Sequence, residues 1–121
     1  VLYAGYLWLL IGFAMKVLVG FNLVTNNLAI HAWTVGMIGI TTYGMMARVS
    51  LGHTGREMRP SKLAVIGFYL LFAAAVVRVI FPLFLMAHYI LLIEISSLLW
   101  VSAFALFSIA YWPVLTKPRV D

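Results

Sequence analysis

The sequence lacks cysteine altogether and is poor in charge. The absence of cysteine excludes disulfides, thiolate metal ligands and cysteine nucleophiles. Only 9% of the 121 residues are charged and 65% are hydrophobic, whereas a soluble domain carries about 25% charged residues. So few charged side chains cannot cover a surface that faces water, and we therefore expect the chain to lie within a lipid bilayer.

Long apolar runs take the place of the missing charge. A helix needs about 20 mainly apolar residues to cross the hydrocarbon of a bilayer. The runs here are that long, and they lack the two-residue alternation of membrane strands. We therefore predict an all-α, polytopic membrane protein with a single domain over residues 1–121. Its four transmembrane helices form an up-down bundle and cover residues 2–20, 28–51, 62–81 and 86–111.

Short polar or proline-containing segments separate these runs. Asn26 and Asn27 are expected to cap the second helix, and Ser61 is expected to cap the third, because short polar side chains accept hydrogen bonds from the first amides of a helix. Pro82 ends or kinks the third helix. The Tyr-Trp-Pro segment at residues 111–113 is expected to close the fourth.

The few basic residues are unevenly distributed along the chain. Residues 48–62 contain four of the eight Lys and Arg residues, and Lys117 and Arg119 lie in the C-terminal tail. The connections after the first and third helices contain none. The positive-inside rule therefore places both termini in the cytoplasm and puts the basic segments beside anionic membrane lipids. The net charge of +5 is explained by this bias, and no nucleic-acid partner is expected.

Five polar residues inside the predicted helices fall at one depth, near the outer membrane surface: Lys16, His31, Arg78, His88 and Glu94. A charge at the centre of a bilayer costs at least ~2.5–3.5 kcal/mol, so charged residues within spans indicate function. A haem held edge-on between helices needs axial histidines and cations for its propionates. This layer contains both, with His31 and His88 as candidate ligands and Lys16 and Arg78 as candidate propionate partners.

Each of these residues also has a plainer interpretation. Lys16 and Arg78 are long enough to reach the outer interface, where their charges stay hydrated. A histidine at the start of a helix is often simply solvated at the interface. Lys16, Arg78 and Glu94 would alternatively form an intramembrane ion pair or a solute path, as in part of a transporter or an assembly subunit. A passive membrane fragment without activity of its own is a third hypothesis.

A histidine between two glycines lies at the opposite membrane face. His53 follows Gly52 and precedes Gly55, and glycines permit a tight turn with close backbone approach to a ligand. Arg48 and Arg56 would favour an anion beside it. The segment is either a cytoplasmic site that includes His53 as a metal ligand, or a structured turn that directs the next helix.

The second predicted helix has two unlike faces. Small residues on one face would allow a partner helix to approach closely: Ala32, Gly36, Gly39 and Ala47. The opposite face carries Thr34, Thr41 and Met45 in line with His31 and Arg48. The threonine hydroxyls either line a polar space or bond back to their own helix. Met45 is either a soft metal ligand or an apolar filler.

Two stretches of the chain resemble a known family. "HAWTVGMIGITTYGMMARVSLGHTGR", residues 31–56, resembles the signature stretch of the NnrS family. "LLWVSAFALFSIAYWPVLTKPRVD", residues 98–121, is similar to the closing helix of that family and its Pro-Arg-Val-Asp end.

The resemblance implies a multi-pass protein of the bacterial inner membrane that contains haem b and copper, has nitric oxide as a ligand, and takes part in the response to nitric oxide. The family motif maps onto His31, Arg48, Gly52, His53, Gly55 and Arg56. Family members are longer, with roughly twelve spans, so the chain corresponds to a C-terminal third. Its partners are then the N-terminal helices of the same protein, or another helix on the Ala32, Gly36 and Gly39 face.

Glu94 is the one residue that we single out as a proton carrier, and whether the protein is an enzyme stays open.

Overall fold

The computed structural model describes residues 1–120, and every regular element in this range is helical. In chain order these elements are α1 (Leu2–Gly20), α2 (Asn26–His31), the π-helix η1 (Ala32–Gly39), α3 (Ile40–His53), α4 (Lys62–Val79), the 3-10 turns η2 (Phe81–Leu83) and η3 (Met86–His88), and α5 (Tyr89–Thr116). The all-α prediction is therefore confirmed.

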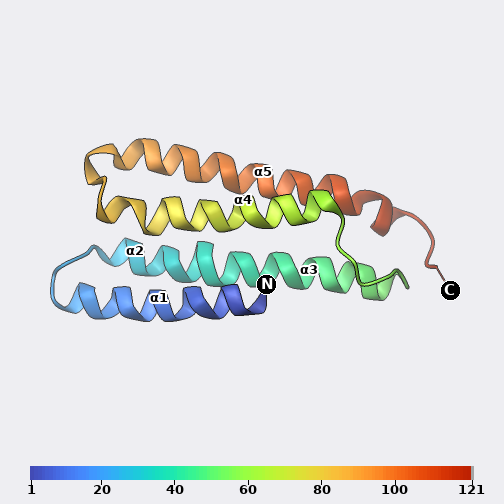
Figure 1. Cartoon of the computed structure of the whole chain (residues 1–121), viewed down its shortest axis with the longest axis horizontal. Helices are drawn as coiled ribbons and strands as arrows, with labels where there is room; N and C mark the ends of the chain where they lie inside the picture. The colour runs from blue at the N-terminus through green and yellow to red at the C-terminus, as the bar shows by residue number, and fades with distance from the viewer. Residues whose placement is uncertain (121) are drawn as a thin grey trace.

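The elements of residues 1–120 form long rods that run alternately up and down (Figure 1). α2, η1 and α3 follow one another as a single rod, which lies beside α1, while α4 lies beside α5. By length and apolar composition, three helices are able to cross a membrane: Leu2–Gly20, Lys62–Leu83 and Met86–Thr116. The rod from residue 26 to residue 53 is divided by η1 into three shorter helical pieces.

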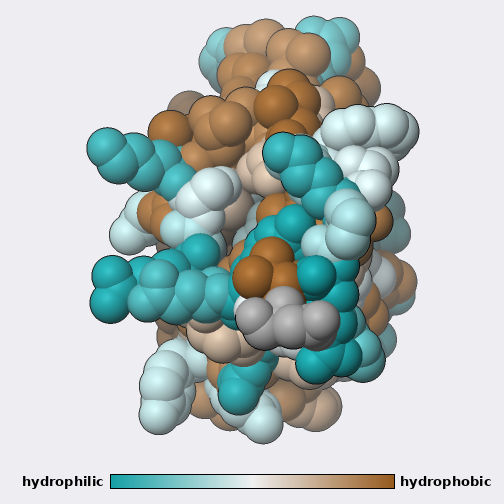
Figure 2. All heavy atoms as spheres, turned by 90° about the vertical axis from the view of Figure 1, so that its right-hand side faces the viewer, coloured by the Kyte–Doolittle hydropathy of each residue, from teal (hydrophilic) through white to brown (hydrophobic). Residues whose placement is uncertain are grey.

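The connections between the rods lie at the two ends of the bundle. One end carries residues 21–25 and the segment around η2 and η3, and the other carries residues 54–61 and the C-terminal tail (Figure 1). Figure 2 looks onto the second of these ends, where hydrophilic side chains gather in front of the apolar body. The two basic segments of the sequence therefore lie at the same end of the bundle.

Two of the predicted helix ends are correct for the expected reason. Ser61 is the N-cap of α4, and its hydroxyl accepts a hydrogen bond from the amide of Ala64 at 3.2 Å. α4 ends at Val79, and Pro82 lies buried in the 3-10 turn that follows. Proline cannot continue the α-helical hydrogen-bond ladder, so the chain turns here.

Two other expectations about helix ends were wrong. The N-cap of α2 is Thr25 rather than Asn26 or Asn27, and its side chain makes no capping hydrogen bond. The fourth helix does not close at residues 111–113 but continues through Pro113 to Thr116. Proline removes a backbone donor and usually kinks or ends a helix, but this helix continues for three residues beyond Pro113, and the Thr116 hydroxyl donates to the carbonyl oxygen of Trp112 at 2.8 Å.

Tryptophan side chains fill the small-residue face of the second rod. Gly36 faces the indole of Trp8 from α1, and Gly39 faces the indole of Trp100 from α5. Ala32 is fully buried on the same side. The face that the sequence offers to a partner helix is therefore covered by two other helices of this chain.

The threonines of the second rod bond back to their own helix. Thr34 donates to the carbonyl oxygen of Ile30 at 3.0 Å, and Thr41 donates to the carbonyl oxygen of Met37 at 2.6 Å. Of the two interpretations of the threonine face, the second therefore applies, because these hydroxyls are satisfied without a polar space.

Candidate functional site

The His31 imidazole is held in one orientation by two hydrogen bonds. Its Nδ1 lies 2.6 Å from the carbonyl oxygen of Asn27, one helical turn earlier. A carbonyl oxygen only accepts, so Nδ1 carries the proton and Nε2 carries the lone pair. Nη2 of Arg78 donates to this Nε2 at 2.9 Å. The half-buried ring therefore presents its lone pair toward α4.

Arg78 has a second amino group with nothing to bond. Its Nη1 is buried and has no hydrogen-bond partner, while the guanidinium carbon lies 5.9 Å from the ring centre of Tyr89. An unpaired buried donor typically costs about 1–3 kcal/mol, and more when it is charged. The guanidinium is thus suited to an additional oxygen acceptor, and a carboxylate is the acceptor that it binds best.

Lys16 belongs to the same end of the bundle but has another partner. Its ammonium group donates to the side-chain oxygen of Asn26 at 2.6 Å, and the lysine is exposed. This bond ties the end of α1 to the start of α2, one residue before the Asn27 carbonyl that orients His31. Lys16 is therefore near the His31 site without contacting Arg78.

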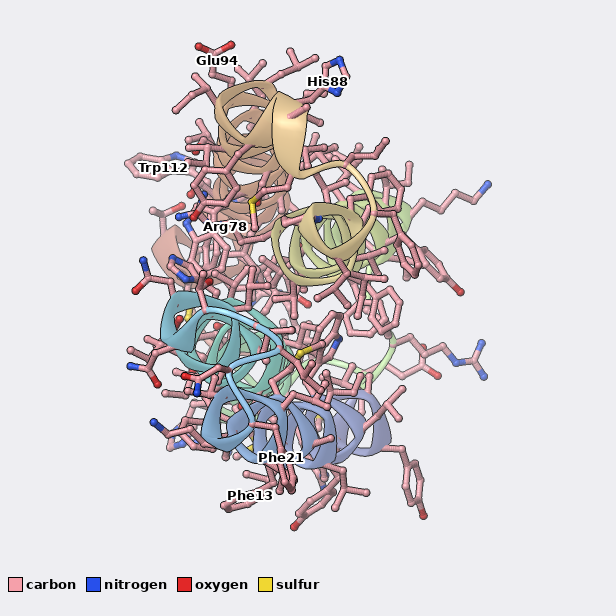
Figure 3. All side chains as sticks on the ribbon, turned by 90° about the vertical axis from the view of Figure 1, so that its left-hand side faces the viewer. Phe13, Phe21, Arg78, His88, Glu94 and Trp112 are labelled. Atoms are coloured by element: carbon pink, nitrogen blue, oxygen red, sulfur yellow. The ribbon has the colours of Figure 1, made fainter. Side chains whose placement is uncertain are left out.

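The remaining two members of the predicted layer point elsewhere. His88 and Glu94 are both exposed. Figure 3 shows them directed away from the bundle at its α5 edge, whereas Arg78 lies on the side that faces α2. The structure therefore brings His31 and Arg78 together and leaves His88 and Glu94 apart from them. Within the described residues, Lys16, Arg78 and Glu94 form no ion pair with one another.

At the opposite end, His53 lines a small pocket with sulfur-containing side chains. The pocket has a volume of about 380 Å³, and its lining includes Met45, Arg48, His53, Met58 and Arg119. Two thioethers and an imidazole are soft or borderline metal ligands, and the arginines favour an anion. Across residues 1–120 no group of three or more His, Asp or Glu side chains is placed to hold a metal, so the thioethers would have to contribute.

The turn that contains His53 also holds the C-terminal tail. Gly55 has φ +69°, and a side chain there would collide with the carbonyl oxygen of Val120. The amide of Val120 donates to the carbonyl oxygen of Thr54 at 3.0 Å. Nη1 of Arg56 donates to the carbonyl oxygen of Val114 at 2.9 Å. Arg56 and Gly55 therefore both help to hold the C-terminal tail and the end of α5 against this turn.

Sequence reasoning missed two contributors to the His31 site. The carbonyl of Asn27 was detectable, because residues four apart lie on one face of a helix. The contribution of Tyr89 could not be detected from the sequence, because its approach to Arg78 depends on the turns between α4 and α5.

The family of the chain follows from a comparison that covers nearly all of it. The family model described as "NnrS protein" matches residues 1–119. The chain belongs to the NnrS family. The match extends well beyond residues 31–56 and 98–121, the two stretches in which the resemblance is visible by eye. No curated protein and no solved structure matches the chain.

Membership in the NnrS family agrees with the apolar helices described above, and the protein is a membrane protein of a family associated with the nitric oxide response. The matched range includes His31, His53, Arg56 and Arg78. Both ends of the bundle therefore lie within the part of the chain that this NnrS protein shares with its family.

Proposed function

We propose that this NnrS protein binds haem and copper in the bacterial inner membrane, with both termini cytoplasmic, and binds nitric oxide as part of nitrosative-stress relief. In this proposal His31 would hold the haem iron through Nε2. The observation that carries it is the orientation of His31, whose Nδ1–H is held by the Asn27 carbonyl while Nε2 is directed toward Arg78.

This orientation is the one that a metal-ligating histidine requires. Such histidines donate one ring N–H to a carbonyl or carboxylate, which fixes the tautomer and leaves the other nitrogen for the metal. Nε2 of His31 is paired with Arg78, so His31 would hold a metal only with this bond released. Nη1 of Arg78 is buried and without a partner, and it would hold a haem propionate. Bound haem supplies the iron at which nitric oxide is coordinated.

Copper is assigned to the other end of the bundle. His53, Met45 and Met58 line one pocket, and thioethers with an imidazole favour Cu(I). Arg48 lines the same pocket and would accept an anion beside the metal. Arg56 has a supporting role in this proposal, because its side chain is engaged with the backbone of α5.

The haem assignment is tested on purified full-length protein by the Soret absorbance per mole of protein. His31→Ala removes the axial nitrogen, and we expect the Soret band to be lost. Arg78→Gln keeps the ligand and weakens haem retention, because only the propionate contact is removed. His88→Ala is the matched control, since this histidine is exposed and points away from Arg78 (Figure 3). Unchanged haem content in the His31 variant would refute this ligand assignment.

The copper assignment is tested by metal analysis of the same protein. His53→Ala and Met45→Leu are each expected to lower the copper content at unchanged haem content, because the two sites lie at opposite ends of the bundle (Figure 1). His88→Ala again serves as the control. Protein purified with neither haem nor copper would instead favour the transporter or assembly-subunit hypothesis, although Lys16, Arg78 and Glu94 are not paired with one another in the described residues.

A further inference from the structure

A second cleft adjoins the His53 pocket, shares Met45, Arg48 and Met58 with it, and lies between the start of α1 and helices α3, α4 and α5. Its volume is about 600 Å³. Aromatic and aliphatic side chains make up most of its wall, among them Tyr3, Tyr43, Leu51, Phe68, Tyr69 and Tyr111. The cleft is large enough for the head of a lipid-soluble molecule and too apolar for a sugar or a nucleotide.

One polar group in this wall lacks a partner. Tyr111 is 2% exposed, and its hydroxyl is buried without any hydrogen bond. The neighbouring phenol of Tyr43 donates to the carbonyl oxygen of Ala64 at 3.0 Å and is therefore already satisfied. The ring of Tyr111 is fixed by stacking on Phe107, with 4.4 Å between the ring centroids. A buried donor held in place without an acceptor is suited to a ligand oxygen.

A second donor lies in the same wall. Arg48 is exposed and is the one charged residue among the described side chains that line the cleft. It projects from α3, whereas Tyr111 belongs to α5. The cleft thus has two donors on different helices, with aromatic rings between the helices that carry them.

We propose that this cleft binds the head of a membrane quinone. A quinone ring is flat and apolar, and its two carbonyl oxygens lie on opposite edges of the ring. One carbonyl accepts from the Tyr111 hydroxyl, the other accepts from the Arg48 guanidinium, and the ring packs against the aromatic side chains. The isoprenoid tail leaves through the open side into lipid. A phospholipid would place its phosphate on Arg48, but its flexible glycerol and acyl chains offer no flat ring to the aromatic wall, whereas the quinone accounts for both the donors and the rings.

The proposal does not depend on haem or copper. Neither His31 nor His53 lines the cleft, whereas Met45, Arg48 and Met58 line both the cleft and the His53 pocket. Tyr111 lines the cleft and not the His53 pocket, so the Tyr111 variant tests quinone binding separately from the copper site. Only binding is proposed, and no electron transfer is part of it.

Binding is measured with tritiated decylubiquinone on the full-length protein in nanodiscs, with unlabelled decylubiquinone as competitor. We expect saturable binding to the wild-type protein. Tyr111→Phe is expected to raise the Kd about five- to tenfold, the loss that follows from one buried hydrogen bond. The control is Tyr6→Phe, which removes a hydroxyl from a side chain of α1 that is 63% exposed and does not line the cleft. This variant is expected to bind like the wild type.

A second readout separates binding from folding. Phenylalanine keeps the volume of Tyr111 and removes an unpaired hydroxyl, so the Tm of the Tyr111 variant without quinone is expected to equal or exceed that of the wild type. Absence of saturable binding to the wild type would overturn the proposal, as would an unchanged Kd in Tyr111→Phe. Displacement of the label by phosphatidylglycerol, abolished by Arg48→Gln and indifferent to Tyr111→Phe, would assign the cleft to a phospholipid and would also overturn it.

Discussion

At the scale of single residues, the His31 site depends on one backbone carbonyl. The Asn27 carbonyl oxygen decides which ring nitrogen of His31 carries the proton, and Arg78 then meets the lone pair on the other nitrogen. The same geometry keeps Nη1 of Arg78 away from any acceptor. The His31 imidazole and the Arg78 guanidinium therefore already lie side by side. The hydrogen bond between them would have to break if His31 bound a cofactor metal.

Gly55 shows how a single backbone conformation supports the other end of the bundle. Its φ of +69° is unfavourable for a residue with a side chain, and the carbonyl oxygen of Val120 occupies the space that a Cβ would take. We predict that Gly55→Ala lowers the free energy of unfolding by about 1–2 kcal/mol from the dihedral alone. It should also speed hydrogen exchange at the Val120 amide, because this amide bonds to Thr54.

Thermal unfolding in detergent, with hydrogen exchange followed by mass spectrometry, measures both effects. Gly20→Ala is the matched control, because nothing lies near the position of its Cβ. Alanine there should leave stability unchanged or raise it slightly, by up to about 1 kcal/mol. Equal stability of the two variants would contradict the role that we assign to the turn.

At the scale of the helices, the π-helix η1 lies directly after His31 and carries the glycines that admit two tryptophans. π-Helical segments occur frequently at functional sites. Here the segment packs Gly36 against Trp8 and Gly39 against Trp100, which ties the second rod to α1 and to α5. A standard helix with larger residues would separate these rods.

We predict that Gly36→Ala destabilises the bundle by about 1–3 kcal/mol, because the added methyl group overlaps the indole of Trp8, which is 1% exposed and has no room to move. Trp8→Phe in the same chain should recover part of this loss, since a smaller ring leaves space for the methyl. A double-mutant cycle in detergent unfolding measures the coupling. Strictly additive effects would show that the two residues do not compete for the same space.

The start of α4 permits a direct test of capping. Ser61→Ala removes the acceptor for the Ala64 amide and should cost about 1 kcal/mol. Thr25→Ala is its control at the start of α2, where the threonine side chain makes no capping bond. We expect a clear fall in unfolding midpoint for the first variant and little change for the second. The reverse order would be incompatible with the two caps as described.

At the scale of the whole molecule, the alternation of the four rods separates the two proposed metal sites. The His31 site lies at the end with the connection of residues 21–25, and His53 lies at the end with the C-terminal tail (Figure 1). The basic residues gather at the His53 end, which we propose to be the cytoplasmic end on the basis of the positive-inside rule. Haem and copper would then be loaded from different faces of the membrane.

Single-cysteine labelling in intact cells tests this orientation, and the chain is well suited to it because it has no cysteine of its own. We predict that a membrane-impermeant maleimide labels Leu23→Cys and Phe84→Cys in intact cells. Glu57→Cys and Lys117→Cys should react only after permeabilisation. All four positions are exposed in the bundle. Labelling of positions 23 and 57 from the same side would be inconsistent with four crossings.

Several features were predictable because they depend on residues close together in the chain. The extent of the first helix, the serine cap at residue 61 and the break at Pro82 all rest on local backbone chemistry, and the structure agrees with them. The limits of local reasoning appear at Pro113, where the helix continues to Thr116. A proline weakens a helix locally, but whether the helix ends depends on what the following turn contacts.

The sequence by itself determined that this protein is helical, that it belongs in a membrane and that it resembles the NnrS family, because composition, run length and motif are all properties of the chain read in order. Only the tertiary structure decided that His31 meets Arg78 while His88 does not, and that the glycine turn receives the C-terminal tail. The physical reason is that depth in the bilayer follows from counting residues along a helix. The direction in which a side chain points around the bundle is set instead by how the helices rotate to pack Trp8 and Trp100 against glycine.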